Sequence, residues 1–198
     1  MTPFIELMDI IEKAKAFGYD NLSNGVRLYG HVPHVAAEAW LHTVYAPLGD
    51  AQISELESVT GKNFPDIFKQ FLSMTNGLNL FSGSLSIDGL RQNNERFGDA
   101  SRQPFSIETP NVYEKPVGTP DTHLSIGGYK YDGSRLVIDT ETLKVFRFPQ
   151  TEAQPVLNEW PSFWDMLLSE AKRLSLQFDN EGKRINPKEP TIPSTLNA

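Results

Sequence analysis

The hydrophobic positions of the chain follow a helical period in several long segments. In residues 4–17, apolar side chains lie on one face, charged side chains lie opposite, and Gly18 follows as a stop signal. Residues 50–77 predict two consecutive helices, because Asp50 is a suitable N-cap for the first and Pro65 is suited to opening the second. The apolar face and the stop of this second helix are formed by Phe64, Ile67, Phe68, Phe71, Leu72, Asn76 and Gly77.

Two further segments have a helical pattern. A last helix is predicted after Trp160, where Phe163 and Leu167 begin an apolar face that continues to about Phe178. A shorter helix is predicted over residues 34–45, which are framed by prolines and carry a stripe of Val35, Ala36, Ala39, Trp40 and Val44.

Between the helices the period changes to that of strands. Strands are predicted at residues 84–88 and 124–126, and a hairpin is predicted from residues 135–139 and 143–148. Residues 91–122 are polar and rich in proline, and they predict a long excursion with one short strand near residues 105–107. Helices followed by an antiparallel meander and a final helix indicate an α+β fold, with a sheet of about four to six strands packed against helices.

The pattern divides the chain into three parts. Residues 50–178 hold the most regular helix and strand signals and form the predicted core domain. Residues 1–49 are expected to be a helical elaboration of the same domain. Residues 179–198 contain three prolines and few hydrophobic side chains, so they are expected to be extended or disordered unless they pack onto the body.

Composition narrows the possible functions. The 198 residues contain no cysteine, which excludes disulfides, thiol catalysis and cysteine-ligated metal, and which favours a cytoplasmic location. The net charge of -7 disfavours direct binding to nucleic acid, because phosphates repel an acidic surface, whereas a basic protein partner would be attracted. No segment approaches the roughly 20 consecutive apolar residues of a membrane span, and no contact with a membrane is expected.

One group of side chains could hold a metal ion. His34, Glu38 and His42 are four residues apart and would share one face of the helix predicted over residues 34–45. A zinc site needs a third or fourth ligand in fixed geometry, and this spacing is not that of the two-histidine protease motif. The alternative is a solvated polar face, and we predict no metal site.

No other motif predicts catalysis. Neither Ser84 nor Ser134 lies in a nucleophile elbow, and the glycine pair at residues 127–128 precedes a strand where a phosphate loop would precede a helix. Asp139 and Glu141 could in principle act as an acid–base pair, but their place at a hairpin end indicates exposed carboxylates. We therefore predict no enzyme activity and no cofactor.

The order of these signals resembles that of the SUKH superfamily, which includes the yeast cell-wall-assembly regulator and many bacterial immunity proteins. The resemblance covers about residues 50–178, and its most specific part is the helix that ends in Asn76-Gly77. Phe64-Pro65 replaces the commoner Leu-Pro, and residues 1–49 and 91–122 lie outside the pattern. Packing or capping is the expected role of the residues that carry the resemblance: Glu57, Pro65, Phe68, Asn76, Gly77, Gly127, Asp139, Trp160 and Phe163.

The resemblance implies a protein that acts by contact. The leading expectation is an immunity protein that binds and neutralises a cognate toxin, possibly a nuclease, with a regulatory adaptor or scaffold as the alternative and a metal-dependent hydrolase as a third hypothesis. The groove between the sheet and residues 91–122 is the expected binding surface. Its candidate contacts are Tyr129, Tyr131, Asp132, Asp139 and Glu141, although the two tyrosines could instead brace a turn.

Overall fold

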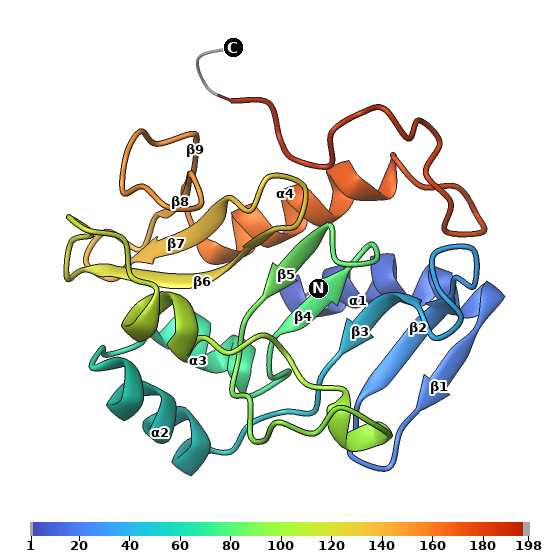
Figure 1. The fold of residues 1–198 in the computed structure, drawn as a ribbon, viewed down its shortest axis with the longest axis horizontal. Coiled ribbons are helices and arrows are strands. Elements are labelled where there is room, and N and C mark those ends of the chain that lie inside the picture. Colours follow the sequence, from blue (N-terminus) through green and yellow to red (C-terminus); the bar gives the residue numbers. More distant parts are fainter. Residues whose placement is uncertain (1, 196–198) are drawn as a thin grey trace.

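A single antiparallel sheet of nine strands organises the computed structural model, which describes residues 2–195 (Figure 1). The strands pair in chain order, so each inner strand lies between its two neighbours in the sequence. The α+β class is confirmed, but the sheet has more strands than the four to six predicted. The strands are β1 Tyr19–Asn21, β2 Arg27–His31, β3 Trp40–Val44, β4 Leu78–Leu80, β5 Leu85–Ile87, β6 His123–Tyr129, β7 Arg135–Asp139, β8 Val145–Phe148 and β9 Asn158–Trp160.

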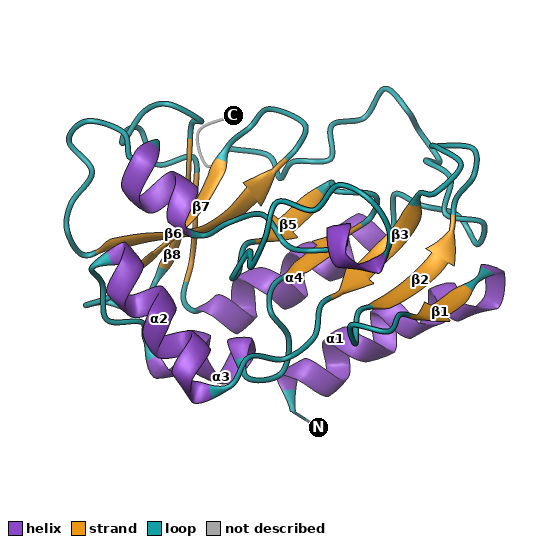
Figure 2. Ribbon diagram, turned by 60° about the horizontal axis from the view of Figure 1, so that its bottom comes forward, coloured by secondary structure: helices purple, strands orange, loops and turns teal. Residues whose placement is uncertain are grey.

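Four α-helices accompany the sheet within the described residues, at the positions that the helical period predicts. They are α1 Pro3–Ile11, α2 Asp50–Thr60, α3 Asp66–Leu72 and α4 Phe163–Ser175, and the 3-10 helix η1 Glu12–Phe17 continues α1. Two N-caps differ by one position from the prediction, since Gly49 caps α2 and Pro65 is itself the cap of α3. The predicted stop of α3 at Asn76-Gly77 is wrong, because the helix ends at Leu72 and the Asn76 side chain binds the backbone of Leu90 instead. Helices α1 and α4 lie side by side against one face of the sheet (Figure 2).

The main core lies between this face of the sheet and the helices. The rings of Phe68 and Phe71 from α3 meet Phe163 of α4 at centroid distances of 5.5 and 4.9 Å, both close to edge-on. Edge-to-face pairs of this kind stabilise a fold beyond the area that they bury. Phe68 and Phe163 are fully buried, as the packing role expected for these two residues requires.

The helix predicted over residues 34–45 is wrong. Residues 40–44 form β3, which pairs with β2 on one side and with β4 on the other. Its last four side chains are all buried, so the strand shows no alternation between apolar and polar positions and resembles a stretch of buried helix. Residues 1–49 therefore contribute three strands as well as a helix, and β3 joins them to the rest of the sheet.

Residues 91–122 cross the face of the sheet opposite α1 and α4 (Figure 2). They contain a short 3-10 helix, η2 Asp99–Ser101, and a single turn of π-helix, η3 Thr109–Tyr113. The strand predicted near residues 105–107 is reduced to an isolated bridge between Gly89 and Ser106. The side chain of Asn111 holds the segment to β6, donating to Ser125 O at 2.7 Å and accepting from Ser125 N at 2.9 Å.

The described part of the C-terminal segment, residues 179–195, packs onto the body of the molecule. Arg173 of α4 donates to Thr191 O at 2.7 Å, Arg147 of β8 donates to Pro193 O at 2.9 Å, and Asn158 donates to Ser194 O at 2.7 Å. Thr191 is buried and Ile192 contacts the core. The sequence left this packing open, because backbone acceptors carry no side-chain signal.

Candidate functional site

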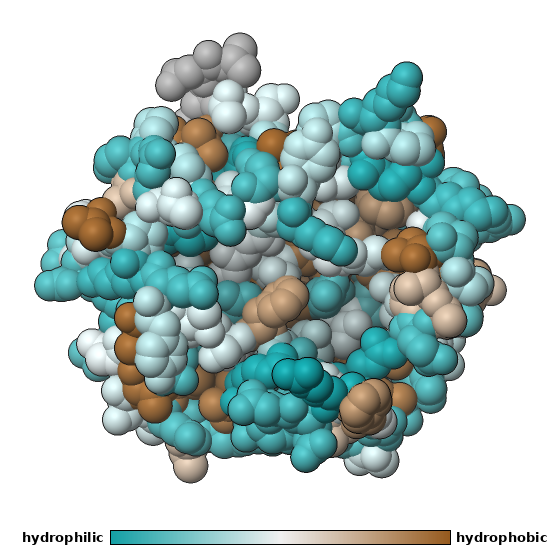
Figure 3. Space-filling model, viewed as in Figure 1, coloured by the Kyte–Doolittle hydropathy of each residue, from teal (hydrophilic) through white to brown (hydrophobic). Residues whose placement is uncertain are grey.

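A groove of about 610 Å³ lies between the sheet and the segment that crosses it. One wall comes from the crossing segment, including Phe105, Thr109 and Glu114, and the rest from β5, β6 and the turn that leads into β7. Figure 3 shows this side of the molecule as a largely hydrophilic surface with scattered hydrophobic side chains. The groove lies where the sequence led us to expect the binding surface.

Strand alternation explains why the floor of the groove is polar. Leu85 and Ile87 of β5 point into the core, and Ser86 and the following Asp88 line the groove on the opposite face. Ser125 of the neighbouring strand lines the same groove and is buried. The period of two in Leu85-Ser86-Ile87-Asp88 is thus enough to place Asp88 away from the core.

The β6 strand approaches β5 closely at Gly127. This residue has a φ of +155°, and a Cβ atom there would lie 2.1 Å from Ser86 O. The register between β6 and β7 also shifts between Ser125 and Gly127. A glycine at this position lets the strand carry an irregularity beside a close neighbour, which is a structural reason for its place among the residues of the SUKH resemblance.

Asp88 is a buried ionisable group in the groove that lacks a partner within the described residues. Its side chain is 7% exposed and has no hydrogen-bond or ion-pair partner among residues 2–195. Burial alone raises the pKa of its carboxyl from the ordinary value of 3.8 to about 8. The Oγ atoms of Ser82 and Ser125, which also line the groove, lack partners within the described residues as well.

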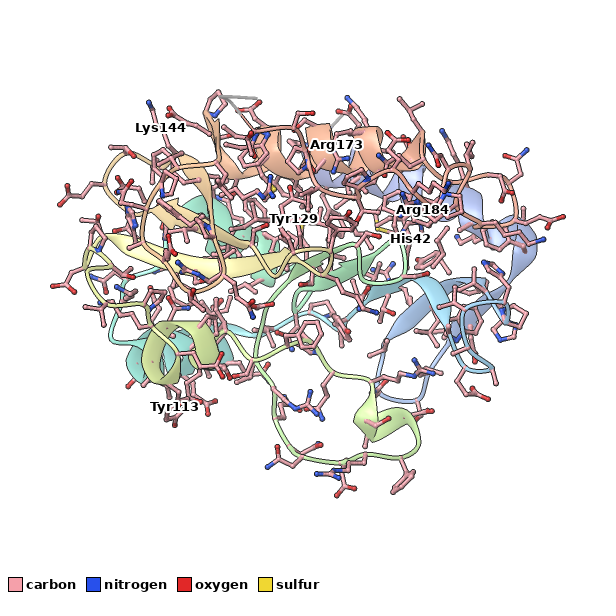
Figure 4. All side chains as sticks on the ribbon, turned by 45° about the horizontal axis from the view of Figure 1, so that its top comes forward. His42, Tyr113, Tyr129, Lys144, Arg173 and Arg184 are labelled. Atoms are coloured by element: carbon pink, nitrogen blue, oxygen red, sulfur yellow. The ribbon has the colours of Figure 1, made fainter. Side chains whose placement is uncertain are left out.

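Tyr129, the first of the predicted contacts, is buried, and the exposure expected for it is wrong. Its hydroxyl donates to Glu170 of α4 at 2.8 Å, and Figure 4 shows its side chain among those between the sheet and α4. Burial, followed by the charge of Glu170, raises the pKa of Tyr129 well above its usual range. The residue joins the sheet to the helix, which is closer to the bracing role left open as the alternative.

Tyr131 and Asp132 lie in the turn between β6 and β7 and behave differently from each other. Tyr131 is 56% exposed and is free to contact a partner. Asp132 forms an ion pair with Arg147 at 2.6 Å and accepts the Ser134 hydroxyl at 2.6 Å. Burial opposes its ionisation, but the hydrogen bonds from Ser134 and Arg147 lower the pKa of Asp132 overall.

Asp139 and Glu141 lie at the other end of β7, away from the turn that holds Tyr131. Asp139 accepts the backbone N–H of Glu141 at 3.0 Å and so closes the hairpin between β7 and β8. Glu141 is exposed, as expected for a hairpin end. The structure therefore does not gather the five predicted contacts into one site, and binding by any of them stays a prediction.

The arrangement proposed for a metal ion is not formed. His42 lies in β3, 2% exposed, and His34 and Glu38 lie in the preceding turns, so the three do not share a helix face. Burial lowers the pKa of His42 to about 3. Across residues 2–195, no group of three or more His, Cys, Asp or Glu side chains could hold a metal ion.

Two residues of the sequence resemblance make contacts that no pattern predicts. Glu57 of α2 accepts the backbone N–H of Phe64 at 2.7 Å and pairs with Lys69 of α3 at 2.7 Å. Asn76 binds both backbone groups of Leu90, accepting its N–H at 2.6 Å and donating to its carbonyl at 2.8 Å. Glu57 thus holds the connection between α2 and α3, and Asn76 holds the backbone that follows Asp88.

The sequence of residues 47–169 matches that of the SMI1 / KNR4 family (SUKH-1), over more than half of the chain. The chain belongs to this family. The resemblance expected from the sequence is confirmed, and the SMI1 / KNR4 span starts just after β3, so β1, β2 and β3 extend the sheet beyond it. The groove lies within the matched span.

The chain is also similar to the uncharacterized protein YnaB of Bacillus subtilis (strain 168). The two sequences are 33% identical over 100 residues. The matched region covers 50% of this SMI1 / KNR4 family member and 54% of YnaB, so the chain spans about half the length of that relative.

None of the helices within residues 2–195 has the length and the apolar character that a membrane span requires.

Proposed function

We propose that this SMI1 / KNR4 family member is a non-catalytic protein-binding domain that neutralises a cognate toxin by covering its active surface. The family match over residues 47–169 carries the proposal, because the SUKH resemblance implies immunity proteins that act by contact. The groove supports it with an accessible surface, lined by polar side chains and by Phe105, on the face of the sheet that α1 and α4 leave uncovered.

Charge supports the choice of a basic partner, such as a nuclease. The chain carries 25 acidic and 18 basic residues, a net charge of -7 at pH 7. Complementary charge accelerates the encounter of two proteins and suppresses binding of partners with like charge. The same charge disfavours direct contact with nucleic acid, so the proposed mode of action is occlusion of the toxin.

Cell protection tests the proposal. The C-terminal domain of the protein encoded directly upstream of this gene would be expressed from an inducible promoter, with and without this chain. We expect the chain to restore growth and to co-purify with that domain. Growth arrest that the chain leaves unchanged, together with no complex, would contradict the proposal, and a complex without protection would favour the adaptor function instead.

A further inference from the structure

An unpaired carboxyl group faces the groove between the sheet and residues 91–122. We propose that Asp88 is an anchor point for one lysine or arginine side chain of the partner protein. This inference rests on the proposed function, since it names the chemistry by which the same groove would recognise a toxin. It assigns a specific contact to a residue that the SUKH resemblance does not include.

The geometry leaves Asp88 available to a ligand. The residue follows β5 on the polar face of the sheet, and its backbone N–H is held by Ile126 O at 2.8 Å. The side chain lines the groove at 7% exposure and meets no hydrogen-bond donor in residues 2–195. Buried carboxyl groups are normally paired or hydrogen-bonded, so an unpaired one that lines an accessible groove points to a missing ligand.

The two basic residues that line the groove do not pair with Asp88. Arg135 lines the groove, but its guanidinium donates to the carbonyls of Gln150 and Glu152 at 3.0 and 2.8 Å. Lys130 also lines the groove and is exposed at the turn after β6. Neither contributes to the pKa of Asp88, which is governed by burial alone.

Other polar and aromatic residues line the same groove. Ser82 and Ser125 are among them, and their buried Oγ atoms have no partners in the described residues. A guanidinium carries five N–H donors and an ammonium three, and both form stronger hydrogen bonds to a carboxylate than neutral donors do. Phe105 lines the groove and is 62% exposed, so its ring can cover the aliphatic stem of an incoming side chain.

Binding of a cation in this groove is expected to strengthen as pH rises. With a pKa of about 8, Asp88 is protonated at neutral pH in the free protein, and it must lose this proton to pair with a cation. The other charged or titratable groups that line the groove are Glu114, Lys130, Arg135 and Tyr129, and the pKa of Tyr129 is raised well above its usual range by burial, which keeps it neutral. Tyr45, which follows β3, also interacts with the charge of Asp88, and its own pKa of about 12 keeps it neutral. Affinity should therefore rise by up to tenfold per pH unit between pH 6 and 8.

Short peptides test this contact without the toxin. The amide signals of the full-length chain labelled with nitrogen-15 would be followed by NMR during titration with acetyl-Gly-Lys-Gly-amide and acetyl-Gly-Arg-Gly-amide. Acetyl-Gly-norleucine-Gly-amide is the neutral control. We expect saturable shifts at Ser125, Gly127 and Gly128 with both cationic peptides, and binding at least tenfold weaker with the norleucine peptide.

Two variants separate Asp88 from general charge. Asp88→Asn keeps the shape of the side chain and is expected to abolish the preference for cationic peptides, whereas Glu141→Gln, which removes a charge from the distant hairpin, is expected to retain it. Equal binding of the norleucine peptide, full binding by Asp88→Asn, or no shift with any peptide would overturn the inference. Each of these results leaves the cell-protection test unaffected, so failure of the anchor and failure of the proposed function are distinguishable.

Discussion

Two ionisable residues, Arg147 and Asp88, are both buried, but only Arg147 has partners that offset the cost of its burial. Arg147 of β8 is 1% exposed and is fully engaged: it pairs with Asp132 and donates to Ser134, Asn158 and the carbonyl of Pro193. Its guanidinium also lies over the ring of Tyr129, 5.4 Å from the centroid. Asp88, in contrast, is buried without a partner among the described residues.

Removal of the Arg147 side chain should be strongly destabilising. Arg147→Ala would leave Asp132 and the acceptors around it unpaired, and breaking a buried pair in this way costs about 3–5 kcal/mol. Lys144→Ala, on the same hairpin, removes an exposed ion pair with Glu159 and should cost about 0–1 kcal/mol. Urea unfolding of both variants measures the difference, and equal losses would show that Arg147 has no special structural role.

The unpaired Asp88 should make the protein less stable as pH rises. The folded-state pKa of about 8 lies above the ordinary value of 3.8, so between pH 4 and 8 the unfolded state releases a proton that the native state retains. The free energy of unfolding therefore falls by up to roughly 1.4 kcal/mol per pH unit in this window and levels off above pH 8. Asp88→Asn should remove this slope and be more stable than the parent at pH 7.

The control for this pH dependence is Glu141→Gln, which changes net charge equally at an exposed hairpin position. Its stability should follow that of the parent chain across the whole range. Unfolding by urea at several pH values measures all three proteins. An Asp88→Asn variant that is less stable than the parent at pH 7 would indicate that the carboxylate is paired.

Individual contacts were the least predictable part of the candidate site. The alternation around β5 is enough to place Asp88 opposite the core, but the groove that it lines is completed by residues 105–114, which are remote in the sequence. Tyr129 was expected in a turn and instead reaches Glu170, 41 positions away, from within β6. A periodic pattern reports the face of an element, whereas the partner of a polar side chain depends on how the elements assemble.

At the scale of elements, local signals predicted most of the helices and the strands of the second half. Proline, glycine and the apolar period marked both bounds of α2 and the start of α3 within one or two residues, whereas α3 ends at Leu72, before the predicted stop at Asn76-Gly77. The hairpin of β7 and β8 and the helix α4 followed in the same way. The prediction for β3 failed because the stability of this strand comes from pairing with β4, which lies more than thirty residues further along the chain.

The stability of the protein should be sensitive to a single added methyl group where β5 and β6 approach each other. Gly127→Ala would place a Cβ 2.1 Å from Ser86 O at a φ of +155°, so the strands must separate, and we expect a loss of more than roughly 2 kcal/mol. Gly118 also has a positive φ, but a Cβ there meets nothing within 4 Å, and Gly118→Ala should cost only about 1 kcal/mol. Thermal unfolding compares the two variants, and similar losses would contradict the importance of this close approach.

At the scale of the whole molecule, the two faces of the nine-stranded sheet are covered differently. Helices α1 and α4 cover one face, and side chains from both belong to the main core. Residues 91–122 cover only part of the other face and leave the groove accessible. The C-terminal segment is held to α4, β8 and β9 by hydrogen bonds from Arg173, Arg147 and Asn158. It therefore links the end of the sheet to the helix that packs on it.

In the proposed function, the protein neutralises a toxin by binding it and not by a reaction. Residual activity of the purified toxin domain, measured after incubation with increasing amounts of this chain, distinguishes the two directly. Occlusion predicts inhibition that rises in proportion to the chain added, ends near equimolar amounts, and does not deepen with longer incubation. Complete and progressive loss of toxin activity at a small fraction of the equimolar amount would show turnover and would contradict the account.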